Sequence, residues 1–218
     1  MWDEQVEEFT DRYRLILWDL PGHGESPPPD GETSLDTSIH DMAAILDRQK
    51  APRAVLGGLG IGGLLSLRFC HAFPHRVRGL ILIGTLPGLR GAATRGLANA
   101  QVNAQANALE TSGLDALEGG AEADPRMHAD AKGLAAAARA LLLQTDAGAL
   151  PFLATIGVPT LILAGGDDTP TLSAARFMAQ TMPNARAIVV PRANHAANLH
   201  KPDAVNAAIG DFLARLPE

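Results

Sequence analysis

The sequence predicts an α/β fold, a mostly parallel sheet flanked by helices, with an inserted helical segment. Short apolar runs recur along the chain and are separated by stretches with helical periodicity, as in parallel sheets covered by helices. A turn with five glycines, within residues 54–65, joins one such run to a helix. From residue 86 to 156 an alanine-rich segment contains no convincing strand. A chain of 218 residues is long enough for one substantial core with an insertion.

The segment before the glycine-rich turn is expected to hold one strand between two helices. A helix ends near Asp11, and the apolar run Arg14–Asp19 (RLILWD) predicts a buried strand. The Pro and Gly residues of DLPGHGES, residues 19–26, predict a tight loop. His23 in this loop is expected to bond its neighbours rather than to act in catalysis. A helix is then expected from Ser34 to about Gln49.

The glycine-rich turn follows a predicted strand at residues 53–57 and has Gly60 at its apex. Such a sharp strand-to-helix turn needs a strained backbone, expected to have a positive φ, which glycine adopts without a Cβ clash. Two interpretations are open from the turn alone. Gly58, Gly60 and Gly63 match G-x-G-x-x-G, a weak motif for phosphate binding in dinucleotide-binding folds. Alternatively, the apex is the position of a catalytic residue.

The middle of the chain is predicted to contain one strand and then helices. Cys70, in the helix after the turn, lies on the order of 15 Å from the apex and is expected to fill the core. A buried strand is predicted at residues 79–84, and helices at 92–109 and 125–143, the latter with Asp124 as its N-cap. The caps and apolar spacing favour a packed helical lid over a low-complexity linker.

The C-terminal part returns to alternating strands and helices. Strands are predicted at residues 159–164 and 186–190, and helices at 171–182 and 202–216. The adjacent Asp167 and Asp168 follow the first of these strands, and His195 follows the second. Because parallel strands bring their carboxyl ends to one edge, we expect these residues to face the apex of the glycine-rich turn.

Composition favours small-molecule chemistry. The net charge of −6 comes from interspersed charges, which gives no basic stripe for nucleic acid and no basic amphipathic helix for a membrane surface. The single cysteine, Cys70, excludes an internal disulfide and a multi-cysteine metal site. The charged N-terminus is unlike a signal peptide, and no apolar run has membrane-spanning length. We expect a soluble cytoplasmic protein without cofactor or metal; an unprotected strand edge would favour a homo-oligomer.

Four stretches together, DLPGHGES, LGGLGIGG, PTLILAGGDD and ANHAANLHKPDAV, resemble the α/β-hydrolase superfamily over nearly the whole chain. The resemblance is to the small-lid branch that includes enol-lactone hydrolases and esterases. It implies a hydrolase core at residues 1–85 and 157–218 and a lid at 86–156. It places the catalytic acid at Asp168 rather than Asp167, the base at His195 and an oxyanion donor at the N–H of Ile61. The coenzyme interpretation explains neither Asp168 nor His195.

The chain departs from the family pattern in two places. The nucleophile's position in G-x-S-x-G is Gly60, which has no side chain to attack a carbonyl. The sequence also begins where the family has passed its first three strands and the loop that gives a second oxyanion donor. We therefore expect Arg14–Asp19 either to pair with Arg53–Gly57 or to stand partly unpaired.

Three functional hypotheses follow. The first is a homologue of hydrolases of small carboxylic esters or enol-lactones that is weak or inactive as it stands, a pseudoenzyme candidate. The second is a general-base enzyme that uses His195 and Asp168 on water or on an acidic substrate without a covalent step. The third is a non-catalytic module that binds a small ligand, which a thermal-shift screen would detect.

Overall fold

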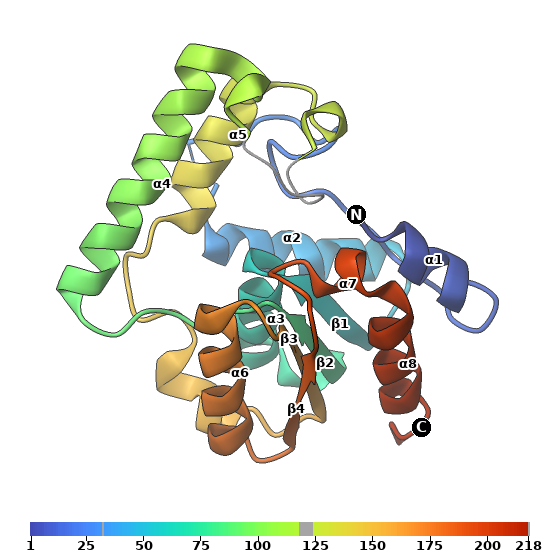
Figure 1. The fold of residues 1–218 in the computed structure, drawn as a ribbon. Coiled ribbons are helices and arrows are strands. Elements are labelled where there is room, and N and C mark those ends of the chain that lie inside the picture. Colours follow the sequence, from blue (N-terminus) through green and yellow to red (C-terminus); the bar gives the residue numbers. More distant parts are fainter. Residues whose placement is uncertain (32, 118–123, 218) are drawn as a thin grey trace. The chain divides into compact units, whose positions relative to one another are not determined.

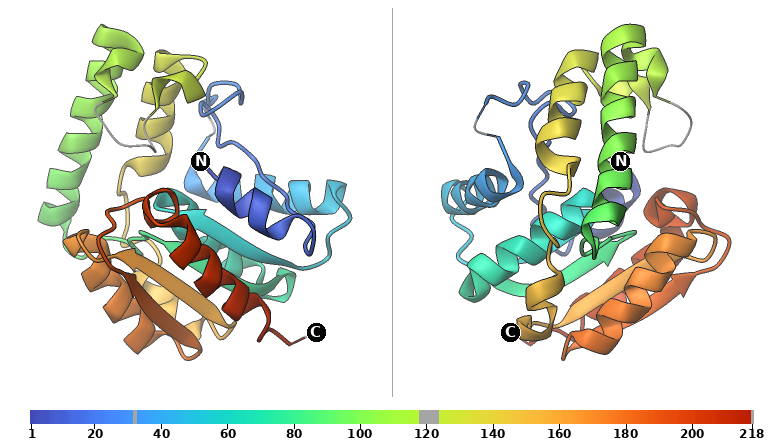
Figure 2. Two further views of the ribbon diagram at one scale, coloured as in Figure 1. Left: turned by 45° about the vertical axis from the view of Figure 1, so that its right-hand side comes forward. Right: turned by 90° about the vertical axis from the view of Figure 1, so that its left-hand side faces the viewer.

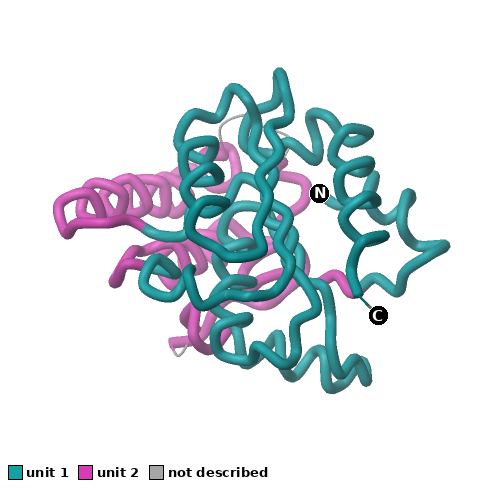
Figure 3. Tube along the Cα trace, turned by 90° about the horizontal axis from the view of Figure 1, so that it is seen from below, with its two compact units in different colours: residues 1–15, 39–88, 148–218 teal, residues 16–38, 89–147 magenta. Residues whose placement is uncertain are grey.

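A computed structural model describes residues 1–31, 33–117 and 124–217. The chain divides into two compact units, drawn in different colours in Figure 3. Unit 1 comprises residues 1–15, 39–88 and 148–218, and unit 2 comprises residues 16–38 and 89–147. Unit 2 thus contains most of the segment expected as a lid, 86–156, together with residues 16–38. The lid itself stays a prediction.

The described residues form one four-stranded parallel sheet in unit 1. Its order is β1-β2-β3-β4, so each strand pairs with the next along the chain. The strands are β1 (Ala54–Leu59), β2 (Val77–Ile83), β3 (Thr160–Gly165) and β4 (Ala185–Val190). Every residue of β3 is buried, which explains why that strand reads as a continuous apolar run. The expected fold class, a parallel sheet flanked by helices, is confirmed.

In unit 1, helices cover both faces of the sheet (Figure 1). The helices are α1 (Asp3–Phe9), α2 (Leu35–Arg48), α3 (Ile61–Ala72), α4 (Ala92–Ser112), α5 (Ala131–Ala137), α6 (Thr169–Thr181), α7 (Ala197–His200) and α8 (Pro202–Leu213). In unit 1, α1 and α8 lie side by side on one face (Figure 2). Their Phe9, Ile209 and Phe212 pack with Ile81 and Leu161 in the main core cluster. Because strand residues alternate between faces, β2 and β3 also bury apolar side chains beneath α3 and α6.

Unit 2 has a small apolar core of its own. Leu109 of α4 packs with Leu134 of α5, together with buried alanines, and Val102, Leu114 and Leu117 pack against this cluster. Arg139, in a π-helical extension of α5 (Ala138–Leu142), makes an ion pair of 2.6 Å with Glu110 of α4. Gly22 approaches Gly133 so closely that a Cβ on Gly22 would lie 2.4 Å from the Gly133 carbonyl oxygen. The loop at residues 19–26 is therefore packed against α5.

Two predicted elements are wrong. Arg14–Asp19 is not a strand, and the Leu17 side chain is 54% exposed. β1 pairs with β2 and not with this segment, so of the two alternatives expected for Arg14–Asp19 the pairing with Arg53–Gly57 is wrong and the unpaired arrangement is the one observed. The helix predicted at 125–143 is broken: a short 3-10 turn at Pro125–Met127 precedes α5, which begins after Asp130. Asp130 accepts hydrogen bonds from two N–H groups of α5, and this cap starts a new helix.

None of the described helices is both long and apolar enough to cross a bilayer. Nor do the described residues contain a cluster of three or more His, Cys, Asp or Glu side chains placed to hold a metal ion.

Candidate functional site

The site is built on the sharp turn between β1 and α3. Gly60 stands between them with φ 55° and ψ −113°, a conformation that side chains rarely tolerate. The turn closes because its flanking positions lack side chains: a Cβ on Gly58 would lie 2.1 Å from the carbonyl carbon of Gly62. A Cβ on Gly63 would lie 1.9 Å from the hydroxyl oxygen of Thr85. The glycines therefore serve the close approach of backbone segments.

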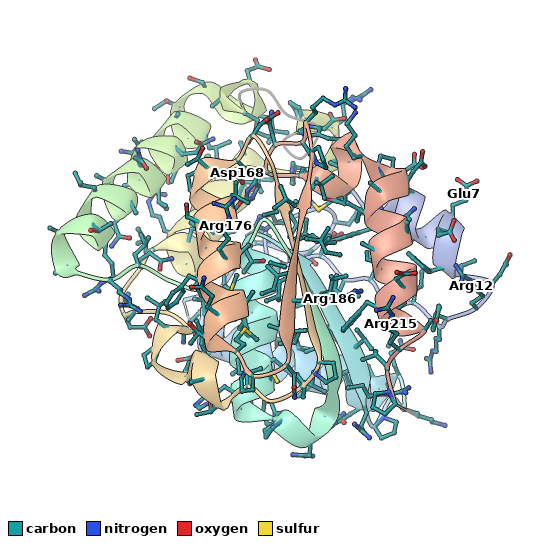
Figure 4. The ribbon with its side chains drawn as sticks, turned by 60° about the horizontal axis from the view of Figure 1, so that its bottom comes forward. Glu7, Arg12, Asp168, Arg176, Arg186 and Arg215 are labelled. Carbon is teal, nitrogen blue, oxygen red and sulfur yellow. The ribbon has the colours of Figure 1, made fainter. Side chains whose placement is uncertain are left out.

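Asp168 and His195 meet at the carboxyl edge of the sheet. Nδ1 of His195 lies 3.1 Å from Oδ2 of Asp168. The loops after β3 and β4 are tied together by backbone bonds, because the N–H of Gly166 donates to Val190 and the N–H of Asp167 donates to Ala193. Figure 4 labels Asp168 at the start of α6. The structure thus brings the expected acid and base into direct contact.

Of the adjacent Asp167 and Asp168, only Asp168 contacts His195. Asp167 is exposed to solvent, whereas the Asp168 side chain is 13% exposed and is the one that contacts His195. The imidazole is more open, at 43%. A mostly buried acid that contacts a half-exposed imidazole is the arrangement that orients a catalytic base.

The other edge of the imidazole faces the apex of the turn. A Cβ built on Gly60 would lie 3.1 Å from Nε2 of His195. An ionised carboxylate only accepts hydrogen bonds, so the proton of a neutral imidazole lies on Nδ1 and the lone pair of Nε2 faces position 60. The arrangement can accept a proton from a group at the apex.

Ile61 is the first residue of α3. The N–H groups of a helix's first turn have no acceptor within the helix, and the helix dipole favours negative charge beside them. The role of the Ile61 N–H as an oxyanion donor stays a prediction.

Two further residues at the site were not found from the sequence. The hydroxyl of Thr171 donates a hydrogen bond of 2.6 Å to Oδ2 of Asp168, and Thr171 is buried. Gly84, after β2, has φ 51°, and a Cβ there would lie 2.7 Å from the His195 carbonyl oxygen and 3.1 Å from its Nδ1. The spacing of Thr171 three residues after an aspartate at a helix start was the available signal. For Gly84 the sequence offers no comparable signal.

Two nucleophilic side chains of α3 are not available for attack. Cys70 is buried in α3, and burial raises the pKa of its thiol to about 11. Ser66 is buried one turn into α3, and its hydroxyl donates to the carbonyl of Gly62. Neither lies at the apex.

Comparisons with known proteins show what the whole chain is similar to. The pattern described as the Alpha/beta hydrolase family matches residues 1–208. The chain is 29% identical to 3-oxoadipate enol-lactonase 2 of Acinetobacter baylyi over 99% of this chain and 84% of that protein. The structure of MenH from S. aureus matches with a TM-score of 0.88 and 28% identity, over 98% of this chain and 88% of that one. The enol-lactonase of Burkholderia xenovorans LB400 shares the fold, with a TM-score of 0.82 and 24% identity over 98% and 86% of the two chains.

Proposed function

The chain belongs to the alpha/beta hydrolase family, and from this premise we propose that it is a relative of small-ester and enol-lactone hydrolases with little or no hydrolytic activity of its own. The observation that carries the proposal is the place of His195. Its Nδ1 contacts Asp168, and its Nε2 lies 3.1 Å from where a Cβ at position 60 would be. The base, which contacts the acid, therefore faces Gly60, a residue that has no attacking atom.

The proposal follows from the chemistry of acyl transfer. In a serine hydrolase the imidazole takes the serine proton, the carboxylate orients the ring and stabilises the imidazolium, and backbone N–H groups receive the oxyanion. His195, Asp168 and the Ile61 N–H would serve these three roles, in that order. Gly60 supplies no oxygen for the nucleophilic attack itself, so no acyl-enzyme can form there.

The absence of a nucleophile should lower the rate of hydrolysis by several orders of magnitude. In a serine protease, removal of the nucleophile lowers turnover on the order of 10⁶-fold and leaves roughly 10³ to 10⁴ over the rate in water. We expect this chain to hydrolyse aryl esters and enol-lactones at such residual rates or below.

The proposal is tested by Gly60→Ser, with Gly60→Ala as its matched control. Both variants add a Cβ at a positive φ, a strain on the order of 1–3 kcal/mol, but only serine adds a hydroxyl. We expect Gly60→Ser to hydrolyse an aryl ester or enol-lactone at least about 10³-fold faster than Gly60→Ala. Rates typical of an enzyme in the unmodified chain, or equal rates in the two variants, would contradict the proposal.

A second candidate is supported by the exposure of His195. The side chain is 43% exposed, and its Nε2 can activate a water or deprotonate a bound acidic substrate without a covalent step. General-base catalysis of this kind contributes typically 10²- to 10⁴-fold. This function requires that His195→Ala abolish activity while Gly60→Ala leaves it intact. Activity that is indifferent to His195→Ala would exclude it.

We also propose a cellular compartment for this protein. The single, buried Cys70 is consistent with a reducing compartment, so we place the protein in the cytoplasm.

A further inference from the structure

Asp168 holds an unusual position for a residue that orients a histidine. It is the N-cap residue of α6, yet its side chain makes no capping hydrogen bond to the helix. Aspartate is among the preferred N-cap residues because its carboxylate accepts from the unpaired N–H groups of the first turn. Two roles therefore compete for one carboxylate: capping α6 and contacting His195.

The hydroxyl of Thr171 bears directly on this competition. Thr171 is the third residue of α6, and its Oγ1 lies 2.6 Å from Oδ2 of Asp168. The same Oδ2 lies 3.1 Å from Nδ1 of His195, so one oxygen accepts from both side chains. Thr171 is 3% exposed, so water does not compete for its hydroxyl. A hydrogen bond to a charged acceptor at this distance is a strong one.

We propose that Thr171 is a positioning residue for the Asp168–His195 pair. Its hydroxyl replaces the helix N–H groups as the donor to Asp168 and so keeps the carboxylate turned toward His195. The inference builds on the proposed function, because it gives a task to a contact that matters only if His195 acts as a base.

Removal of the hydroxyl has a specific expected consequence. In Thr171→Val the carboxylate loses a strong donor, while the backbone N–H of residue 171 remains as an alternative, since Pro170 has no N–H, so the carboxylate turns to cap the helix. Helix stability then changes little, but Nδ1 of His195 loses its acceptor. The neutral imidazole is no longer held in the tautomer with the proton on Nδ1.

The test is ¹⁵N NMR of the His195 ring at about pH 9, where an ordinary imidazole is neutral, with the signals assigned by their loss in His195→Ala. We expect the Nδ1–H tautomer in the parent and in Thr171→Ser, and a mixture of tautomers in Thr171→Val. Thr160→Val is the matched control, because Thr160 is a buried threonine of β3 whose hydroxyl donates to the Val158 carbonyl. It should leave the His195 signals unchanged.

Two results would overturn the inference: an unchanged His195 tautomer in Thr171→Val, or a mixed one in Thr171→Ser, which would assign the effect to packing of the methyl group. Should the valine variant not fold, Thr171→Ala removes the hydroxyl without adding bulk and decides in the same way.

Activity provides a separate arm. Added to Gly60→Ser, Thr171→Val should lower kcat by up to about 100-fold with little change in KM, and Thr171→Ser should restore it. If Gly60→Ser is inactive, the proposed function fails, while the tautomer measurement still decides the role of Thr171.

Discussion

Gly58→Ala is expected to be severely destabilising because the turn at the site leaves no room for a methyl group. The new Cβ would lie 2.1 Å from the carbonyl carbon of Gly62, where carbon atoms at contact are about 3.5–4.0 Å apart. The obstacle is backbone and not a flexible side chain, so β1 and the start of α3 must separate by more than about 1 Å. Overpacking usually costs about 1–3 kcal/mol, occasionally more, and we expect about 3 kcal/mol here.

Urea denaturation followed by circular dichroism measures this cost. With an m value of about 2 kcal/mol/M, the midpoint should fall by about 1.5 M. Gly62→Ala is the matched control: it lies two residues past the apex, and a Cβ there meets no heavy atom within 4 Å. Alanine in place of a helical glycine should stabilise by up to about 1 kcal/mol. A midpoint for Gly58→Ala equal to that of the parent, or an equal loss in both variants, would refute the packing argument.

Three other predictions concern the site and its surroundings. Gly84→Ala should displace His195, because the new Cβ would lie 2.7 Å from the His195 carbonyl oxygen. Loss of the Nδ1–H tautomer of His195, measured by NMR, checks this, and an unchanged tautomer would contradict it. Cys70 should resist alkylation at about pH 8 in the native protein and react once urea unfolds it, because burial raises its thiol pKa to about 11. Burial, and secondarily the nearby His23, lower the pKa of His128 in the folded protein. Below about pH 6.5 the unfolded state therefore binds more protons than the folded state, and the free energy of unfolding falls as pH drops through that range. The thermal midpoint should therefore depend less on pH in His128→Asn, and equal dependence in parent and variant would exclude this cause.

The sheet of unit 1 could be predicted from the sequence because its central strands, β2 and β3, are buried on both faces. Runs such as residues 79–84 and 159–164 are apolar throughout and lie between helical stretches, and the structure places strands there. The same signal failed at Arg14–Asp19, where an apolar run lies outside the sheet with Leu17 exposed. An apolar composition indicates that a segment gains free energy by burial. A strand also requires a neighbouring backbone to which it can hydrogen-bond.

The helix predicted at 125–143 failed for a local reason. Asp124 does accept from a backbone N–H, that of Arg126, as expected. The predicted helix includes Asp130 as an interior residue. Its carboxylate instead accepts hydrogen bonds from backbone N–H groups and caps α5.

At the site, sequence order predicted the contact between Asp168 and His195, because both follow parallel strands of one sheet. The roles of Thr171 and Gly84 depend on side-chain direction and on the approach of distant backbone, which one-dimensional patterns do not contain.

Covalent labelling of Gly60→Ser with a fluorophosphonate, read by intact mass and peptide mapping, tests most directly whether Asp168 and His195 can activate a nucleophile placed at position 60. The account predicts one adduct, at position 60, that is absent from the unmodified chain and from Gly60→Ser combined with His195→Ala. A folded Gly60→Ser protein that takes no label, or an adduct that forms equally well without His195, would contradict it.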